Sequence, residues 1–207
     1  MKVIKLFLAL LMLTVVFSGC NSGSKPGAEA PKTGDTAKMT LKFKEMGKEV
    51  SKEMVVKQGA VKPLDITPTV KGVDTKLVDY EFYVTNYEFT PSDLTGRYPK
   101  KDGDLLVMIQ ILGEKGATKE SPIKAGTYNT ATPADGAEVA SKAWHVVIKY
   151  FEEGKMKTAT LAADTPQGAR KGFVKINSVA DGVVKGEIDI SDDFGSVKGA
   201  FSAKATK

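Results

Sequence analysis

The chain has 207 residues, in which 30 lysines and arginines outnumber 25 aspartates and glutamates, and it holds one cysteine and one histidine. A lone cysteine excludes an internal disulfide, and one cysteine with one histidine supplies too few ligands for a zinc or thiolate centre. The basic residues are spread singly among apolar ones, whereas a nucleic-acid site clusters them and interleaves aromatic residues, so we expect no nucleic-acid partner.

Residues 1–19 have the layout of a signal peptide. Lys2 and Lys5 form a short positive region, and Leu6 to Val16 is an almost unbroken apolar run. As a helix this run spans roughly 16 Å, well short of the hydrocarbon core of a membrane at roughly 30 Å. The sequence therefore predicts a cleaved leader over residues 1–19 and not a transmembrane helix.

The leader ends in Phe17-Ser18-Gly19-Cys20, which contains the only cysteine. This tetrapeptide resembles the lipobox of bacterial lipoproteins, with Phe17 where that family usually has leucine. The resemblance implies that diacylglycerol is attached to the Cys20 thiol, that the chain is cut before Cys20, and that the new amine is usually acylated. The alternative is an ordinary secretory signal that leaves a free thiol near the mature N-terminus.

Lipidation of Cys20 implies a protein anchored in the bacterial cell envelope, because two or three acyl chains hold a protein on a membrane where one chain binds only marginally. In a Gram-negative cell the membrane would be the outer one, and the domain would face the periplasm or the exterior. The covalent lipid is the only non-protein group that we expect, and neither a metal nor another cofactor is predicted.

Residues 20–38 read as the lipidated cysteine followed by a flexible tether. After Cys20 the stretch contains no aromatic or β-branched aliphatic residue, so it cannot bury enough apolar surface to order itself. As a flexible coil it reaches about 23 Å on average. Residues 39–207 are then long enough for a single globular domain with one core.

Alternation of apolar and polar residues predicts strands from residue 39 onward. Met39 to Lys44 alternates strictly. Glu49 to Val56 is either its hairpin partner or a helix, because its apolar residues also recur at helical spacing, and Gly47 before it favours the hairpin. Leu64 to Val70 contains Pro68, so we expect a short strand at a sheet edge.

The middle of the chain holds its most aromatic and its most apolar segments. Val78 to Phe89 changes phase near Thr85-Asn86, which predicts a β-bulge there. Leu105 to Leu112 is apolar on both faces and predicts a central strand. Asn129 to Ser141 reads as a long polar loop.

The next strand, Trp144 to Phe151, is expected to place Trp144 on the same face as Val146 and Ile148, and Glu152 to Lys155 predicts a hairpin turn after it. The chain then ends in a predicted three-stranded antiparallel meander. Its members are Phe173–Ile176, Val184–Ile190 and Val197–Ala203, joined by turns at Asp181-Gly182 and Asp192–Gly195.

Together these patterns predict an all-β domain, an antiparallel sandwich or barrel of about nine or ten strands that ends in a meander. The domain is also similar to uncharacterised β-rich lipoproteins that close on a Gly-x-Phe-x-Ala strand, here Gly199 to Ala203. That similarity implies no activity.

We find no catalytic motif in the sequence. His145 lies within a predicted strand and reads as a half-exposed strand residue. Asp102-Gly103-Asp104 and Asp189 to Asp193 carry oxygen ligands suited to calcium, but they lack the ordered spacing of a calcium loop and also read as turn residues.

Tyr83 and Tyr87 are the residues that we predict for partner binding, because they lie on the opposite parity from Tyr80 and Phe82 and exposed tyrosines suit protein or carbohydrate contacts. The sequence favours a non-enzymatic binding or accessory domain that is attached to a membrane and contacts an envelope protein or carbohydrate. The alternative is a carboxylate-based hydrolase acting on envelope glycans or peptides, which needs two facing acids in a pocket.

Overall fold

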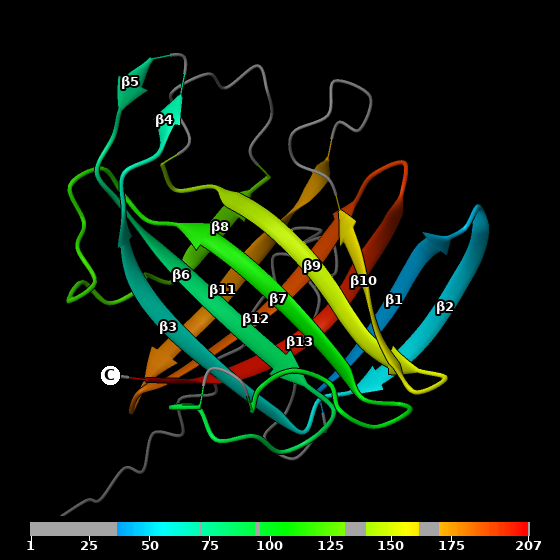
Figure 1. Ribbon diagram of the computed structural model, residues 1–207. Helices are drawn as coiled ribbons and strands as arrows, with labels where there is room; N and C mark the ends of the chain where they lie inside the picture. The colour runs from blue at the N-terminus through cyan, green and yellow to red at the C-terminus, as the bar shows by residue number, and fades with distance from the viewer. Residues whose placement is uncertain (1–36, 71, 94–95, 131–139, 162–169, 207) are drawn as a thin grey trace, which may run out of the picture. The chain divides into compact units, whose positions relative to one another are not determined.

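The computed structural model describes residues 37–70, 72–93, 96–130, 140–161 and 170–206, all within the compact unit Pro31–Lys207 (Figure 1). The predicted leader, Cys20 and the tether up to residue 36 lie outside the described residues. The described part contains strands and no helix, which confirms the all-β fold. The strands are β1 (Lys38–Glu45), β2 (Lys48–Val55), β3 (Gln58–Ile66), β4 (Thr69–Val70), β5 (Val73–Asp74), β6 (Leu77–Thr85), β7 (Leu105–Leu112), β8 (Gly126–Asn129), β9 (Ala143–Glu152), β10 (Lys155–Leu161), β11 (Lys171–Ala180), β12 (Val183–Ser191) and β13 (Gly195–Ala205).

One sheet folds back on itself to give two layers. Its strand order is β10-β9-β7-β6-β3-β13-β12-β11-β8, and β1 with β2 branches from β13. Figure 1 shows β3, β6, β7, β9 and β10 in one layer and β1, β2, β11, β12 and β13 in the other. Every pairing in this sheet is antiparallel except that of β3 with β13, which is parallel and only two residue pairs long. The predicted C-terminal meander is confirmed as β11-β12-β13.

The core lies between the two layers. Phe82 on β6 meets Phe201 on β13 edge-to-face with ring centroids 5.3 Å apart, and Phe43 on β1 lies 5.0 Å from Tyr150 on β9. Along most strands the core residues recur at every second position, because successive side chains of a strand point to opposite faces. Each layer therefore presents one apolar face to the other.

Tight turns with two left-handed residues join the hairpins. Met46-Gly47 has φ angles of 48° and 79°, and Glu153-Gly154 has 54° and 73°. Positive φ at both central positions matches the right-handed twist of the flanking strands. The hairpin reading of Glu49 to Val56 and the turn predicted at Glu152 to Lys155 are therefore confirmed.

Two strand predictions are wrong in detail. The strand predicted over Leu64–Val70 is split, because β3 ends at Ile66 and Pro68 separates it from the short β4. The bulge predicted near Thr85-Asn86 is absent, since β6 ends at Thr85. Instead the register shifts between β7 and β9, where Ile109 faces Val146 and Ile111 faces Ala143.

This shift also moves Trp144 off the core face. Ala143 and Val146 both line the main core although they are three residues apart, which is the spacing that a bulge produces. Trp144 instead packs against Leu77 and Leu112 in a second, smaller apolar cluster. The prediction that Trp144 shares a face with Val146 is therefore wrong.

Strands β6 and β7 are covered on both faces, as predicted for Leu105–Leu112. Inward residues such as Phe82 and Ile109 are fully buried, but so are Leu106 and Leu112 on the outer face. The loop between β6 and β7 folds back over this outer face, where the Arg97 guanidinium lies 3.9 Å from the Tyr83 ring centroid.

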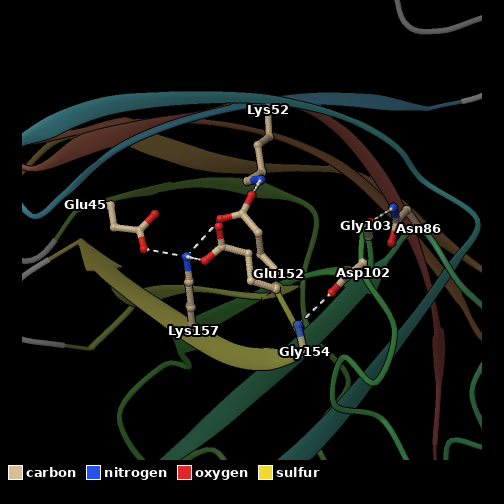
Figure 2. A network of polar contacts seen from close by, with 9 residues as sticks. Glu45, Lys52, Asn86, Asp102, Gly103, Glu152, Gly154 and Lys157 are labelled. Carbon is tan, nitrogen blue, oxygen red and sulfur yellow. Dashed lines mark hydrogen bonds and ion pairs between the residues drawn. The ribbon is translucent and has the colours of Figure 1, made fainter.

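A charged network connects the two layers where the sheet does not close. It consists of Glu45, Lys52, Glu152 and Lys157. The Lys157 ammonium lies 2.8 Å from Glu45 Oε1 and 3.0 Å from Glu152 Oε2, and Lys52 lies 2.8 Å from Glu152 Oε1. Figure 2 shows Glu152 between the two lysines. Because β1 and β2 carry one half of the network and the β9–β10 hairpin the other, side-chain ion pairs join edges that no main-chain ladder connects.

Candidate functional site

A groove opens where β3 and β13 separate. The parallel ladder pairs Lys204 with Ala60 and Ala205 with Val61, and the Thr206 amide then donates to the Val61 carbonyl at 2.9 Å. Beyond this point β3 continues along β6 alone. Gly59 permits the close approach before the separation, since a Cβ at this position would lie 2.1 Å from the Ser202 carbonyl oxygen.

The groove has a volume of about 650 Å³, within the range of small-molecule pockets. Its walls are mostly apolar. Val61, Pro63 and Leu64 of β3 form one side, and Val179 and Val184 at the turn between β11 and β12 form another. The remaining lining residues are Lys62, Tyr80, Lys119, Glu120, Ser121, Pro122, Ile123, Ala205 and Thr206.

The 113–124 loop closes one side of the groove and is fixed at three points. The Gly113 amide donates to the Val78 carbonyl at 2.8 Å, and the Lys119 amide donates to Asp65 Oδ1 at 2.7 Å. The Tyr80 hydroxyl donates to the Ser121 carbonyl at 2.8 Å, and burial raises the pKa of Tyr80 to about 12, so this donor stays protonated. The loop is thus fixed to β3 and β6.

A second cavity of about 370 Å³ is lined by residues of the same loop. It shares Tyr80, Ser121 and Pro122 with the groove, and its further lining includes Lys115 and Lys124. The two cavities therefore adjoin at the hydrogen bond between Tyr80 and Ser121.

The predicted binding residues Tyr83 and Tyr87 do not form an exposed surface. Tyr83 is 2% exposed, and its hydroxyl donates to Glu81 Oε2. The Tyr87 side chain is half-buried, and its hydroxyl donates to the Arg97 carbonyl. Burial raises the pKa of both tyrosines. The prediction that Tyr83 is exposed is wrong, because the loop after β6 covers the outer face on which parity alone placed it.

Two acids share one donor on this covered face. The Gln110 side-chain amide donates to Asp79 Oδ2 at 2.7 Å and to Glu81 Oε1 at 3.3 Å. His145 Nδ1 lies 2.9 Å from Gln110 Oε1, so the only histidine of the chain belongs to the same cluster. Burial and the nearby Glu81 charge raise the pKa of Asp79 to about 7, and Asp79 is 4% exposed.

Of the carboxylates considered from sequence as calcium ligands, Asp104 and Asp192 bind the main chain of turns, and Asp189 pairs with the Lys198 side chain. Asp104 Oδ2 accepts from the amides of Lys100 and Lys101, each at 3.0 Å, and Asp192 Oδ1 accepts from those of Phe194 and Gly195 at 2.8 and 2.9 Å. Within the described ranges, no three His, Cys, Asp or Glu side chains lie close enough together to hold a metal ion. Nor do the described residues contain a helix that could span a membrane.

Sequence reasoning missed the groove. Its walls come from β3, the 113–124 loop, the β11–β12 hairpin and the last residues of β13, which are far apart in the chain. The one local signal was the apolar pair Pro122-Ile123 inside a polar loop, and Ile123 is indeed buried. No family model, curated protein or solved structure matches the chain.

Proposed function

We propose that this protein is a lipid-anchored protein of the bacterial cell envelope whose β-domain binds an apolar ligand or segment without chemical catalysis. The groove is the observation that carries the proposal. It is large, mostly apolar and bounded by hydrogen-bonded main chain on two sides. A concave apolar site with a few polar groups is the usual form of a ligand pocket. Such walls suit an apolar partner better than the carbohydrate considered from sequence.

The anchor part of this proposal rests on Cys20 and its lipobox-like context. Changing Cys20→Ser should move the protein out of the membrane fraction, as uncleaved precursor or soluble protein, because the thiol that carries diacylglycerol is lost. Cell fractionation with size analysis checks this. A Cys20→Ser protein that still matured to the same size and stayed with membranes would contradict the anchor.

The binding part is tested with an environment-sensitive apolar dye and the full-length Cys20→Ser chain, which carries no acyl group on that residue. Val179→Glu places a charge in the groove and should abolish dye binding. Val179 is 40% exposed, so the change should leave the core intact. Val55→Glu is the matched control, because Val55 is 50% exposed on β2 and does not line the groove. Equal dye binding by both variants would contradict the proposal.

A carboxylate-based hydrolase is the second candidate, and the shared donor between Asp79 and Glu81 is the observation in its favour. One acid of raised pKa beside another carboxylate is the arrangement that such an enzyme needs. Neither residue lines the groove, and Asp79 is nearly inaccessible, so we rank this function lower. Hydrolysis of envelope glycans or peptides that Asp79→Asn and Glu81→Gln each abolish would reverse the ranking.

A further inference from the structure

The two cavities that meet at the 113–124 loop differ in polarity. The groove walls are mostly apolar, and its neighbour is lined by Glu114, Lys115, Lys124 and the phenol of Tyr128 as well as by small residues. A site with an apolar part next to a basic part complements a molecule that has an apolar part next to an anionic group. That molecule is an amphiphile.

Each of the two cavities is lined by a lysine of the loop that has no ion pair with a described residue. Lys124 forms an ion pair with Glu114 at 2.6 Å. Lys115 in the small cavity and Lys119 in the groove have no ion pair with any residue that the structure describes. Glu120 also lines the groove, next to Lys119 in sequence, so the loop carries a modest excess of positive charge and not a strong field.

The free edge of β3 is a poor template for an added peptide strand. Pro63 has no amide hydrogen, and the Val61 carbonyl already accepts from Thr206. Proline on a strand edge removes the donor that strand addition uses. Recognition in the groove must therefore come from its apolar side chains and from the charged loop.

On the premise of the proposed function, we infer that the groove binds a single-chain fatty acid. Its hydrocarbon chain lies along Val61, Pro63, Val179 and Val184, and its carboxylate lies at the 113–124 loop near Lys115 and Lys119. Burial of the chain supplies most of the affinity, and the lysines select an anionic head over a neutral one.

The test uses displacement of a dansyl-labelled fatty acid from the full-length Cys20→Ser chain. Dodecanoate should displace the probe, and dodecanol, which has the same chain and no charge, should displace it about fivefold less well. The affinity of shorter fatty acids should fall by up to about fourfold for each methylene removed.

Charge reversal at the loop locates the head group. Lys115→Glu and Lys119→Glu should each lower the affinity for dodecanoate by about fivefold and leave the affinity for dodecanol unchanged. Lys185→Glu is the matched control, since Lys185 is exposed on β12 and does not line either cavity. It should change neither ligand.

The outcomes distinguish a failure of the proposed function from a failure of the fatty-acid inference. If neither ligand displaces the probe, or if Val179→Glu binds as well as Val55→Glu, the groove is not a ligand site and the proposed function fails. If dodecanol matches dodecanoate and the lysine variants have no effect while Val179→Glu abolishes binding, the groove binds apolar ligands and the fatty-acid inference alone is overturned.

Discussion

In the described part of the chain, two of the connections between the layers depend on different kinds of interaction. At the junction of β3 with β13, main-chain hydrogen bonds connect the layers in a fixed register. At the opposite side, the charged network of Glu45, Lys52, Glu152 and Lys157 does so with side chains alone. The first junction leaves an apolar groove beside it, and the second is covered by charges.

This difference shows how an open sheet can leave a groove at one junction, between β3 and β13, and cover the other, between β1–β2 and β9–β10, with ion pairs. Main-chain pairing is tied to backbone geometry, so the groove at the β3–β13 junction is built into the fold. Ion pairs of half-exposed side chains depend on salt and pH, and each contributes modestly. The two junctions should therefore respond differently to truncation, packing changes, acid and salt.

Removing Val197–Lys207 should have the largest effect. The deletion takes away most of β13, which pairs with β1, β3 and β12, together with the buried Phe201. The loss is of the order of a whole domain's stability, about 5–15 kcal/mol. Circular dichroism should show no cooperative melt. In contrast, a chain starting near Met39 should melt cooperatively with a β-type spectrum, and a truncated protein that melted as sharply would contradict the role given to β13.

The second largest effect is expected from a change of pH, and it depends on Asp79 beside the groove. Asp79 pairs with the groove residue Leu64 across β3 and β6. Burial raises the pKa of Asp79 to about 7 from an ordinary value near 4, so the folded state holds a proton that the unfolded state has released. The free energy of unfolding should then fall as pH rises from about 4 to 7, by up to about 1.4 kcal/mol per pH unit.

Asp79→Asn should remove this decline, and urea titrations at several pH values measure it. The amide keeps an oxygen that can accept from Gln110, so the variant should fold. Glu187→Gln, on β12 in the other layer, is the control variant. The same slope in wild type and Asp79→Asn would show that Asp79 titrates normally.

Gly59→Ala should strain the β3–β13 junction. The new Cβ would lie 2.1 Å from the Ser202 carbonyl oxygen, and because the neighbour is backbone, one strand has to move. We expect a loss of about 1–3 kcal/mol in chemical denaturation, with weaker binding in the groove. Gly47→Ala is the comparison, since no atom lies within 4 Å of its Cβ position and only the positive φ opposes it. Equal losses would mean that the junction tolerates the added methyl group.

The smallest effect is expected at the charged network. Lys157→Gln should lower stability at low salt, and the difference from wild type should shrink in 1 M salt because ions screen the pairs. Hydrogen bonds from Lys157 and Lys52 lower the pKa of Glu45 and Glu152, so their contribution is present above the ordinary pKa of glutamate and is lost as pH falls through the lowered values.

Hydrogen exchange locates this change. In acid, β2 and β10 should lose protection before β3 and β13 do. Lys175→Gln, which breaks an ion pair with Glu187 between strands already joined by a ladder, is the control. An effect of Lys157→Gln that did not depend on salt would contradict the electrostatic account.

Sequence reasoning predicted the strands where one face is buried and the other is in water. The meander that contains Ile188 and Phe201 alternates in that way, and it was predicted correctly. Strand β6 was misread because its second face is also covered: Tyr83 has the parity of a surface residue, but it is buried and Arg97 of the following loop lies over its ring.

The groove could not be predicted for a related reason. It depends on a parallel contact of two residue pairs between Ala60–Val61 and Lys204–Ala205, and no local pattern encodes so short a long-range pairing. The sequence did contain a proline that marks a strand edge, but the edge lies at Pro63, within β3, and not at Pro68.

The charged network has a further consequence for solubility. In the described part of the chain β2 pairs only with β1 and β10 only with β9, so each has one edge without a neighbouring strand. Unpaired edges invite strands from other molecules, and charged side chains on an edge oppose that addition because a second molecule would have to desolvate them. Lys52 and Lys157 lie on these strands. The residues that hold the layers together therefore also protect the protein from edge-to-edge aggregation.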